Sequence, residues 1–277
     1  KYMATKEYKC KVCGYVHKGT NAPEKCPLCG APSSEFEEIK KGLNTSSNTY
    51  TIFYSVILVI VVAFLLAFVS KTLQPQSDKN VMIDKKSQIL SSLNIRNVDK
   101  NKIEAIYEKV IVADKIVNAQ GLVIKDGENK DQDGFKVNTK EITDQNLPLY
   151  VCNLDGQTKY VIPVTGRGLW GGLWGYIALN ADKKTIYGAY FSHESETAGL
   201  GARITEYEGF QKQFEKKQIF DETGKIGIRV LKDGKSPEVK EENRCDAITG
   251  ATLTSDGVNN MLHDCLTQYI QFFKQNN

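Results

Sequence analysis

Four cysteines in the first part of the chain have the spacing of a metal site. Cys10 and Cys13 form one Cys-x-x-Cys pair, and Cys26 and Cys29 form a second pair after twelve intervening residues. Two such pairs can hold one ion in tetrahedral geometry, and zinc and iron both fit four thiolates. The chain has seven cysteines, and an odd number with one tight cluster argues for a metal site instead of a disulfide framework.

The segment DAITGATLTS, residues 246–255, combines small residues with hydroxyls just before a predicted amphipathic helix. Thr254 or Ser255 could simply cap that helix. Capping leaves the pair Gly250 and Ala251 unexplained. Small residues let a phosphate approach the backbone, and a helix N-terminus offers free N–H groups and partial positive charge. The segment therefore predicts a site for a ligand that carries a phosphate.

A long apolar run lies between these two sites. Residues 52–69 read IFYSVILVIVVAFLLAFV, in which Ser55 is the only polar side chain apart from the Tyr54 hydroxyl. As a helix the run spans about 27 Å, close to the roughly 30 Å hydrocarbon core of a bilayer. A buried helix of a soluble core is the alternative, but the run has no polar face. We expect a transmembrane helix and no cleavable signal sequence, because the run comes fifty residues into the chain. The lysines on both flanks give only a weak signal of orientation.

The rest of the chain predicts an α+β domain with its own core. Apolar spacing indicates two helices within residues 81–112, joined near Asn94, and a final amphipathic helix over residues 255–273. Short strands alternate with Gly and Asp turns from about residue 121 to 193. We also expect a helix over residues 202–220 and a strand at IGIRVL. The net charge of +3, without a basic stripe, does not indicate nucleic-acid binding.

These patterns predict a fold of three parts: a small four-cysteine metal-binding domain, a single transmembrane α-helix and an α+β domain that binds a ligand with a phosphate. The predicted boundaries are 1–41 for the metal domain, 42–51 for a linker, 52–70 for the membrane helix and 71–277 for the α+β domain.

The first domain resembles a known metal-binding module. YKCKVCGYVHKG and APEKCPLCGAPSSEFEEI, within residues 7–39, closely resemble the rubredoxin-type domain at the end of rubrerythrins. The resemblance implies one iron ion bound by all four cysteines of the two pairs, with a structural zinc ribbon as the alternative. The domain is so short that the metal is expected to supply much of its folding free energy.

The segment near the end of the chain resembles a flavin-attachment motif. DAITGATLTSDGV is similar to the motif Asp-x-x-Ser/Thr-Gly-Ala-Thr of FMN-binding subunits in ion-pumping redox complexes. In that family the last threonine of the motif forms a phosphoester with FMN, and it matches Thr252. Asp246 matches the acidic residue that a flavin transferase is expected to need, and Thr254 is the nearest competing hydroxyl. The other motif residues expected at the cofactor are Thr249, Gly250 and Ala251.

Two further stretches indicate which kind of FMN-binding subunit the chain resembles. GRGLWGGLWGYIALNADKKTI, residues 166–186, and SHESETAGLGARI, residues 192–204, look like the NqrC-type C subunit of the sodium-translocating NADH:quinone oxidoreductase. That resemblance covers residues 50–277. The G subunit of the related RNF complex is the near alternative. It normally has Thr-Pro-Gly-Leu-Gly where this chain has Thr-Ala-Gly-Leu-Gly at 197–201, and it lacks the GRGLWG stretch.

The resemblance also implies which residues lie near the flavin. The loop residues expected against the isoalloxazine are Glu196, Thr197, Leu200 and Gly201. Trp174 is a plausible ring neighbour, and a tryptophan of the strand core is an equal alternative. No catalytic acid or base is expected, since His193 and Glu194 are interpreted as polar loop residues. The cysteines outside the cluster are interpreted as small buried residues: Cys152, Cys245 and Cys265.

By this resemblance the chain is an electron-relay subunit of a multi-subunit NADH:quinone reductase that exports sodium, and it is not a complete enzyme alone. The implied location is the bacterial inner membrane, with the iron domain cytoplasmic and the FMN domain on the periplasmic face. The implied partners are the other subunits and a flavin transferase. The rubredoxin-like module departs from the family, whose members have few residues before the helix.

Two other classes of protein have similar motifs. One is an extracytoplasmic flavoprotein that is tethered to the membrane and has a structural zinc ribbon. The other is an assembly protein that carries no flavin.

Overall fold

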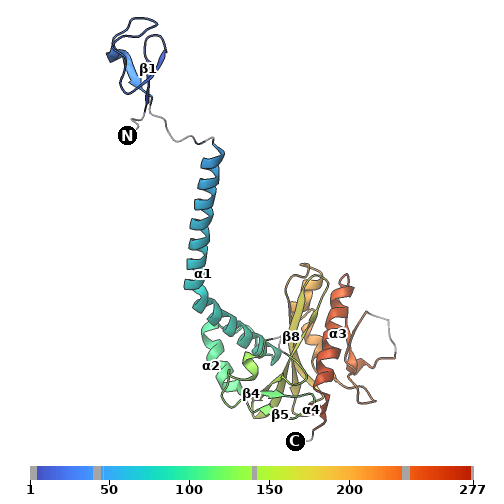
Figure 1. The fold of residues 1–277 in the computed structure, drawn as a ribbon. Helices are drawn as coiled ribbons and strands as arrows, with labels where there is room; N and C mark the ends of the chain where they lie inside the picture. Colours follow the sequence, from blue (N-terminus) through green and yellow to red (C-terminus); the bar gives the residue numbers. More distant parts are fainter. Residues whose placement is uncertain (1–4, 40–44, 46, 139–141, 233–237, 276–277) are drawn as a thin grey trace. The chain divides into compact units, whose positions relative to one another are not determined.

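The computed structural model of the protein describes residues 5–39, 45, 47–138, 142–232 and 238–275 (Figure 1). The chain divides into two compact units, Lys1–Pro75 and Gln76–Asn277, and each is described by itself. Within the predicted linker 42–51, residues 42–44 and 46 lie outside the described residues, as do Lys40 and Lys41.

The first unit contains a small antiparallel sheet around the cysteine pairs. Its strands are β1 (Lys6–Cys10), β2 (Val16–Gly19) and β3 (Phe36–Glu38), in the order β2-β1-β3. A short 3-10 segment, Ser33–Glu35, leads into β3. The turns after Cys13 and Cys29 contain Gly14 (φ +78°) and Gly30 (φ +77°). A side chain at either position would meet open space, so the left-handed backbone conformation is what requires glycine there.

The apolar run is the first part of a longer helix than expected. Helix α1 spans Asn48–Ser92, 45 residues, and includes Pro75. It begins four residues before the predicted membrane segment 52–70 and continues into the first of the helices predicted after residue 81. None of the most apolar stretch of α1 is buried inside the protein, and the helix is long and apolar enough to cross a membrane.

The second unit is built on a six-stranded antiparallel sheet in the order β5-β4-β6-β7-β8-β9. The strands expected between residues 121 and 193 are confirmed. The bounds of the six strands are Ile111–Val117 for β4, Val123–Lys125 for β5, Leu147–Leu154 for β6, Gln157–Arg167 for β7, Gly172–Asn180 for β8 and Ile186–His193 for β9.

Helices cover both faces of this sheet, as the alternation of side chains along β8 shows. The remaining helices are α2 (Lys100–Val110), α3 (Thr252–Gln268) and α4 (Ile270–Lys274). Leu173 and Ile177 belong to the core cluster that contains Val258 of α3. Tyr176 and Ala178 belong to a second cluster, which contains the end of α1 and residues of α2. Figure 1 shows α3 beside β8. The sheet therefore separates an α3 side from an α1 side.

The end of α1 is fixed to this unit by charged side chains. Lys86 is 3% exposed, its Nζ lies 2.6 Å from Asp131 Oδ2, and it lies 4.9 Å from the centre of the Tyr107 ring. Lys85 donates to the carbonyl oxygens of Phe135 and Val137. Burial lowers the pKa of Lys85 to about 8.

The helix predicted over residues 202–220 is wrong. The structure has two short 3-10 segments there, Gly201–Thr205 and Gln211–Phe214. The buried side chains in this stretch belong to the α3-side core: Ile204, Phe210, Phe214 and Ile219. Their spacing of six, four and five residues does not follow a helical period of 3.6. Packing against the sheet, with ring centres of Phe214 and Phe191 5.0 Å apart, decides the conformation.

The stretch before α3 forms a small parallel pair. The strand predicted at IGIRVL is reduced to β10 (Arg229–Leu231), and it pairs with β11 (Arg244–Asp246). A 3-10 turn, Glu241–Asn243, precedes β11. The pair brings Asp246 to the beginning of the segment that leads into α3.

Candidate functional site

The four cysteines of the first unit converge on one point. Their Sγ atoms all lie within 4.8 Å of one another. Cys10 Sγ lies 3.7 Å from Cys29 Sγ, and Cys13 Sγ lies 3.5 Å from Cys26 Sγ. A tetrahedron with metal–sulfur bonds of about 2.3 Å has edges of roughly 3.8 Å. The cluster thus fits one metal ion, although this geometry serves iron and zinc equally.

The two cysteine pairs are held by matching backbone turns. In the first turn the N–H of Gly14 donates to the carbonyl of Cys10 at 2.9 Å, and in the second the N–H of Gly30 donates to that of Cys26 at 2.9 Å. Cys10 and Cys26 are buried, whereas Cys13 and Cys29 are exposed. One edge of the metal site is therefore open to solvent.

The hydroxyls at the start of α3 differ sharply in their surroundings. Helix α3 begins at Thr252, three residues earlier than predicted, and no side chain caps it. Thr254 is 2% exposed, and its hydroxyl donates to Glu196 Oε2 at 2.6 Å. Ser255 is fully buried; its hydroxyl donates to the carbonyl of Ala251 and accepts from the N–H of Ile248, both at 3.0 Å. The capping interpretation of Thr254 and Ser255 is thus wrong.

Thr252 and Thr249 are the exposed hydroxyls of the segment 246–255. Thr252 is the first residue of a helix of 17 residues, where free N–H groups and the helix dipole favour a phosphate. Ala251 precedes it, and Gly250 has φ +84°. This environment fits the phosphate of FMN, with Thr252 as the side chain that points outward from the first turn.

The loop after β9 lies against this first turn. A Cβ on Gly201 would lie 2.5 Å from Thr254 Oγ1 and 2.6 Å from Glu196 Oε2, and a Cβ on Gly250 would lie 3.1 Å from Leu200 Cδ2. The carbonyl of Thr197 accepts the N–H of Leu200 at 3.1 Å, which makes the loop turn. The structure therefore brings the four predicted loop residues together with the motif.

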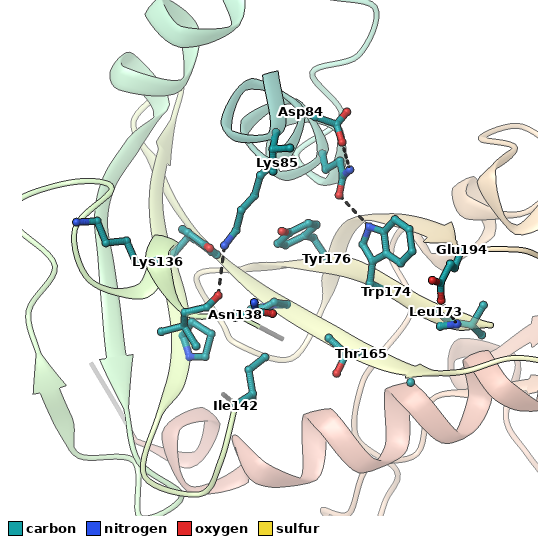
Figure 2. Close-up of a pocket in the computed structure, with 18 residues that line it drawn as sticks. Asp84, Lys85, Lys136, Asn138, Ile142, Thr165, Leu173, Trp174, Tyr176 and Glu194 are labelled. Atoms are coloured by element: carbon teal, nitrogen blue, oxygen red, sulfur yellow. Dashed lines mark hydrogen bonds between the residues drawn. The ribbon is translucent and has the colours of Figure 1, made fainter. Parts of the chain in front are cut away.

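Trp174 lies on the side of the sheet that faces α1, away from the motif. It pairs with Thr165 across β7 and β8, and its indole N–H donates to Gln88 Oε1 of α1 at 3.1 Å. It lines a cavity of about 700 Å³ on the α1 side of the sheet, with Lys85, Tyr176 and Glu194 (Figure 2). Since α3 packs on the other face, the role of Trp174 as a flavin neighbour stays a prediction.

Exposed apolar side chains of the β7–β8 loop and of the first turn of α3 were missed. Trp170 is 66% exposed and its N–H donates to Glu196 Oε1 at 2.9 Å; Leu169 and Leu253 are also exposed. A sequence signal existed, because Leu-Trp-Gly occurs twice in GLWGGLWG at residues 168–175. The first copy lies in the loop between β7 and β8, and the second lies in β8.

Asp246 is held through its backbone. The Gln213 side chain accepts the N–H of Asp246 at 2.5 Å and donates to its carbonyl oxygen at 3.0 Å. The carboxylate of Asp246 is left exposed. Gln213 comes from the stretch that was predicted to be helical, so no local pattern indicated this contact.

Comparison with known proteins agrees with both sites. The FMN-binding domain model matches residues 168–267, and the rubrerythrin, rubredoxin-like domain model matches residues 8–37. The crystal structure of the C subunit of Na(+)-translocating NADH-quinone reductase from Parabacteroides distasonis is 38% identical, with a TM-score of 0.66, over 74% of this chain and 98% of that one. The chain belongs to the family of this C subunit.

Other members of the family match over most of their length. The C subunit of Pseudomonas aeruginosa is 27% identical over 79% of this chain and 92% of its own length, and that of Haemophilus ducreyi is 28% identical over 78% and 89%. The structure of NqrC from Shewanella oneidensis, 24% identical with a TM-score of 0.59, has the same fold. The family expected from the sequence is confirmed.

The geometry of the cysteine site predicts that the metal holds the first unit together. We expect removal of the metal from the reduced full-length protein to unfold residues 5–39, because structural zinc sites of comparable peptides contribute about 10 kcal/mol or more. Hydrogen exchange measured by mass spectrometry should show loss of protection in β1 and β3, with residues 76–277 unchanged. Cys26→Ser should reproduce the effect.

Cys152→Ser, which changes a buried cysteine of the second unit, is the matched control and should leave β1 and β3 protected. Full protection of residues 5–39 in protein shown by elemental analysis to be free of metal would contradict the prediction.

Proposed function

We propose that this protein is the electron-relay subunit of a membrane-bound, redox-driven sodium pump that transfers electrons from NADH to quinone. In this proposal FMN is attached to Thr252 by a phosphoester, and one iron ion is bound by the four cysteines. The observation that carries the proposal is the single outward-facing hydroxyl in the first turn of α3. The relatives, which are named as the C subunit of Na(+)-translocating NADH-quinone reductase, support the wider role.

At the flavin site the chain's own residues would bind the phosphate of FMN and orient the cofactor. The backbone N–H groups of the first turn of α3 would hold the phosphate, and the small residues Gly250 and Ala251 would let it approach. Asp246, exposed beside the motif, is the residue that we expect a flavin transferase to contact. When bound, FMN supplies the ability to accept and pass on electrons, and the protein supplies its position and electrostatic surroundings.

At the metal site four thiolates would hold iron, which supplies one-electron chemistry when bound. The exposed edge at Cys13 and Cys29 brings the ligand sulfurs within reach of a partner. The rubredoxin-like character of residues 8–37 favours iron over zinc. If the metal proves to be zinc, the alternative of a membrane-tethered flavoprotein with a structural ribbon gains support, and elemental analysis of the purified protein decides between them.

The proposed topology places the two sites on opposite sides of the membrane. Reduced thiolates suit the cytoplasm, and we assign the FMN domain to the periplasmic face of the bacterial inner membrane. Residues 52–69 contain no redox group and span about 27 Å as a helix, so iron cannot pass electrons directly to a flavin on Thr252. The iron module then serves the cytoplasmic side of the complex, through a donor or a centre held by neighbouring subunits.

Flavin attachment at Thr252 predicts a clear result in denaturing gels. Wild-type protein expressed with a flavin transferase should show flavin fluorescence that survives denaturation, and Thr252→Ala should show none. Thr249→Ala removes the other exposed hydroxyl and Thr254→Val removes the nearest buried one, so both should remain fluorescent. An absence of fluorescence in every sample would favour the assembly-protein alternative. Loss of fluorescence in Thr249→Ala alone would indicate that the flavin is attached to Thr249 instead.

The proposed place of the iron predicts that NADH reduces it within the assembled complex. Rapid mixing of the purified complex with NADH should bleach the ferric–thiolate absorbance on the timescale of turnover. Cys10→Ser, which removes a ligand, should abolish that signal. If the iron stays oxidised while every other centre is reduced, the iron does not lie on the route from NADH.

A further inference from the structure

We propose that Glu196 is a positioning residue for the covalent flavin: its buried carboxylate joins the β7–β8 loop to the first turn of α3, presents Thr252 outward, and places a fixed negative charge beside the cofactor. This inference rests on the proposed attachment of FMN to Thr252. It differs from the expectation that Glu196 merely lies against the flavin ring.

Two segments that are remote from Glu196 in the chain meet at the two oxygens of its carboxylate. Oε2 accepts the hydroxyl of Thr254 from α3 at 2.6 Å, and Oε1 accepts the N–H of Trp170 from the β7–β8 loop at 2.9 Å. The N–H of Glu196 itself donates to Nδ1 of His193 at 3.2 Å, at the end of β9. The partners lie 58 and 26 residues away in the chain, so the carboxylate is a long-range link.

Two glycines leave room for the carboxylate of Glu196. A Cβ on Gly168 would lie 2.4 Å from Oε1, and a Cβ on Gly201 would lie 2.6 Å from Oε2. Neither glycine has a positive φ angle, so close approach is the reason for glycine at both positions. Any side chain at either position would displace the carboxylate from its partners.

Glu196 keeps its charge although it is only 7% exposed. Burial alone would raise the pKa of this carboxyl, but the hydrogen bonds from the Thr254 hydroxyl and from the backbone of Trp170 and Gly171 hold the pKa below its usual value. Charge-assisted hydrogen bonds of this kind are about twice as strong as neutral ones. The start of α3 adds favourable partial positive charge.

Three consequences follow for the flavin. Thr254 is turned inward by its bond to Glu196, while Thr252, two residues earlier on the helix, faces outward. The same carboxylate holds the backbone of Trp170, whose ring is exposed. A fixed negative charge close to a flavin opposes the addition of electrons, because it destabilises the more negative reduced form.

The test is the midpoint potential of the covalent flavin, measured by spectroelectrochemistry on full-length protein. Glu196→Gln removes the charge with little change of shape and should raise the potential. Thr254→Val removes a hydrogen bond that neutralises part of the charge and should lower it. Glu196→Asp keeps the charge and should stay closer to wild type than Glu196→Gln. Glu194→Gln, two residues away on the same loop, is the matched control and should match wild type.

A purely structural role for Glu196 predicts lower melting temperatures without opposite shifts of potential. Equal potentials in wild type, Glu196→Gln and Thr254→Val, or shifts of the same sign in both variants, would overturn the inference. If Glu196→Gln does not fold, the sign of the Thr254→Val shift alone decides. Thr252→Ala in the same series separates the attachment site from the role of Glu196. Flavin fluorescence that survives in Thr252→Ala would refute the attachment site. Loss of fluorescence in Thr252→Ala, together with unchanged potentials in the Glu196 and Thr254 variants, would refute only the role of Glu196.

Discussion

The hydrogen bond from Thr254 to the buried carboxylate of Glu196 is the contact that joins the separate segments around the flavin site. It joins the start of α3 to the loop after β9, and through the N–H of Trp170 it also holds the loop between β7 and β8. The body of α3 is fixed separately, because its apolar face packs into the core on one side of the sheet. The rigid helix thus sets the position of Thr252, and the carboxylate holds the Thr254 hydroxyl inward.

Local patterns predicted the elements of the fold better than their ends. The strands β6 to β9 were predictable because they are short, mostly buried runs between turn residues, and the membrane segment of α1 was predictable because it is continuously apolar. The helix expected over residues 202–220 failed because Phe210 and Phe214 pack on Phe191, which is remote in sequence. The start of α3 was placed three residues late because Thr254 and Ser255 resemble caps, yet they form other hydrogen bonds.

The candidate sites, like the fold, could be predicted only in part from local sequence patterns. The cysteine pairs were predictable because ligand spacing alone brings the four sulfurs together. The flavin motif was predictable as a segment, but its supports were not: the contact of Gln213 with Asp246 spans 33 residues. The two copies of Leu-Trp-Gly could not be distinguished until the β7–β8 turn was known. That turn exposes Trp170 and directs Trp174 toward α1.

A relay must exchange electrons with partners, and both sites lie at the surface of their own unit. Cys13 and Cys29 are exposed ligands, and Thr252 is exposed at the start of α3. The central claim is that this threonine carries the flavin, and tandem mass spectrometry of the native protein tests it most directly. Trypsin should release residues 245–274, between Arg244 and Lys274. The account predicts that the added mass of FMN first appears in fragments that contain Thr252. The same mass on Thr249 or Thr254, or an unmodified peptide from flavin-transferase-matured protein, would contradict it.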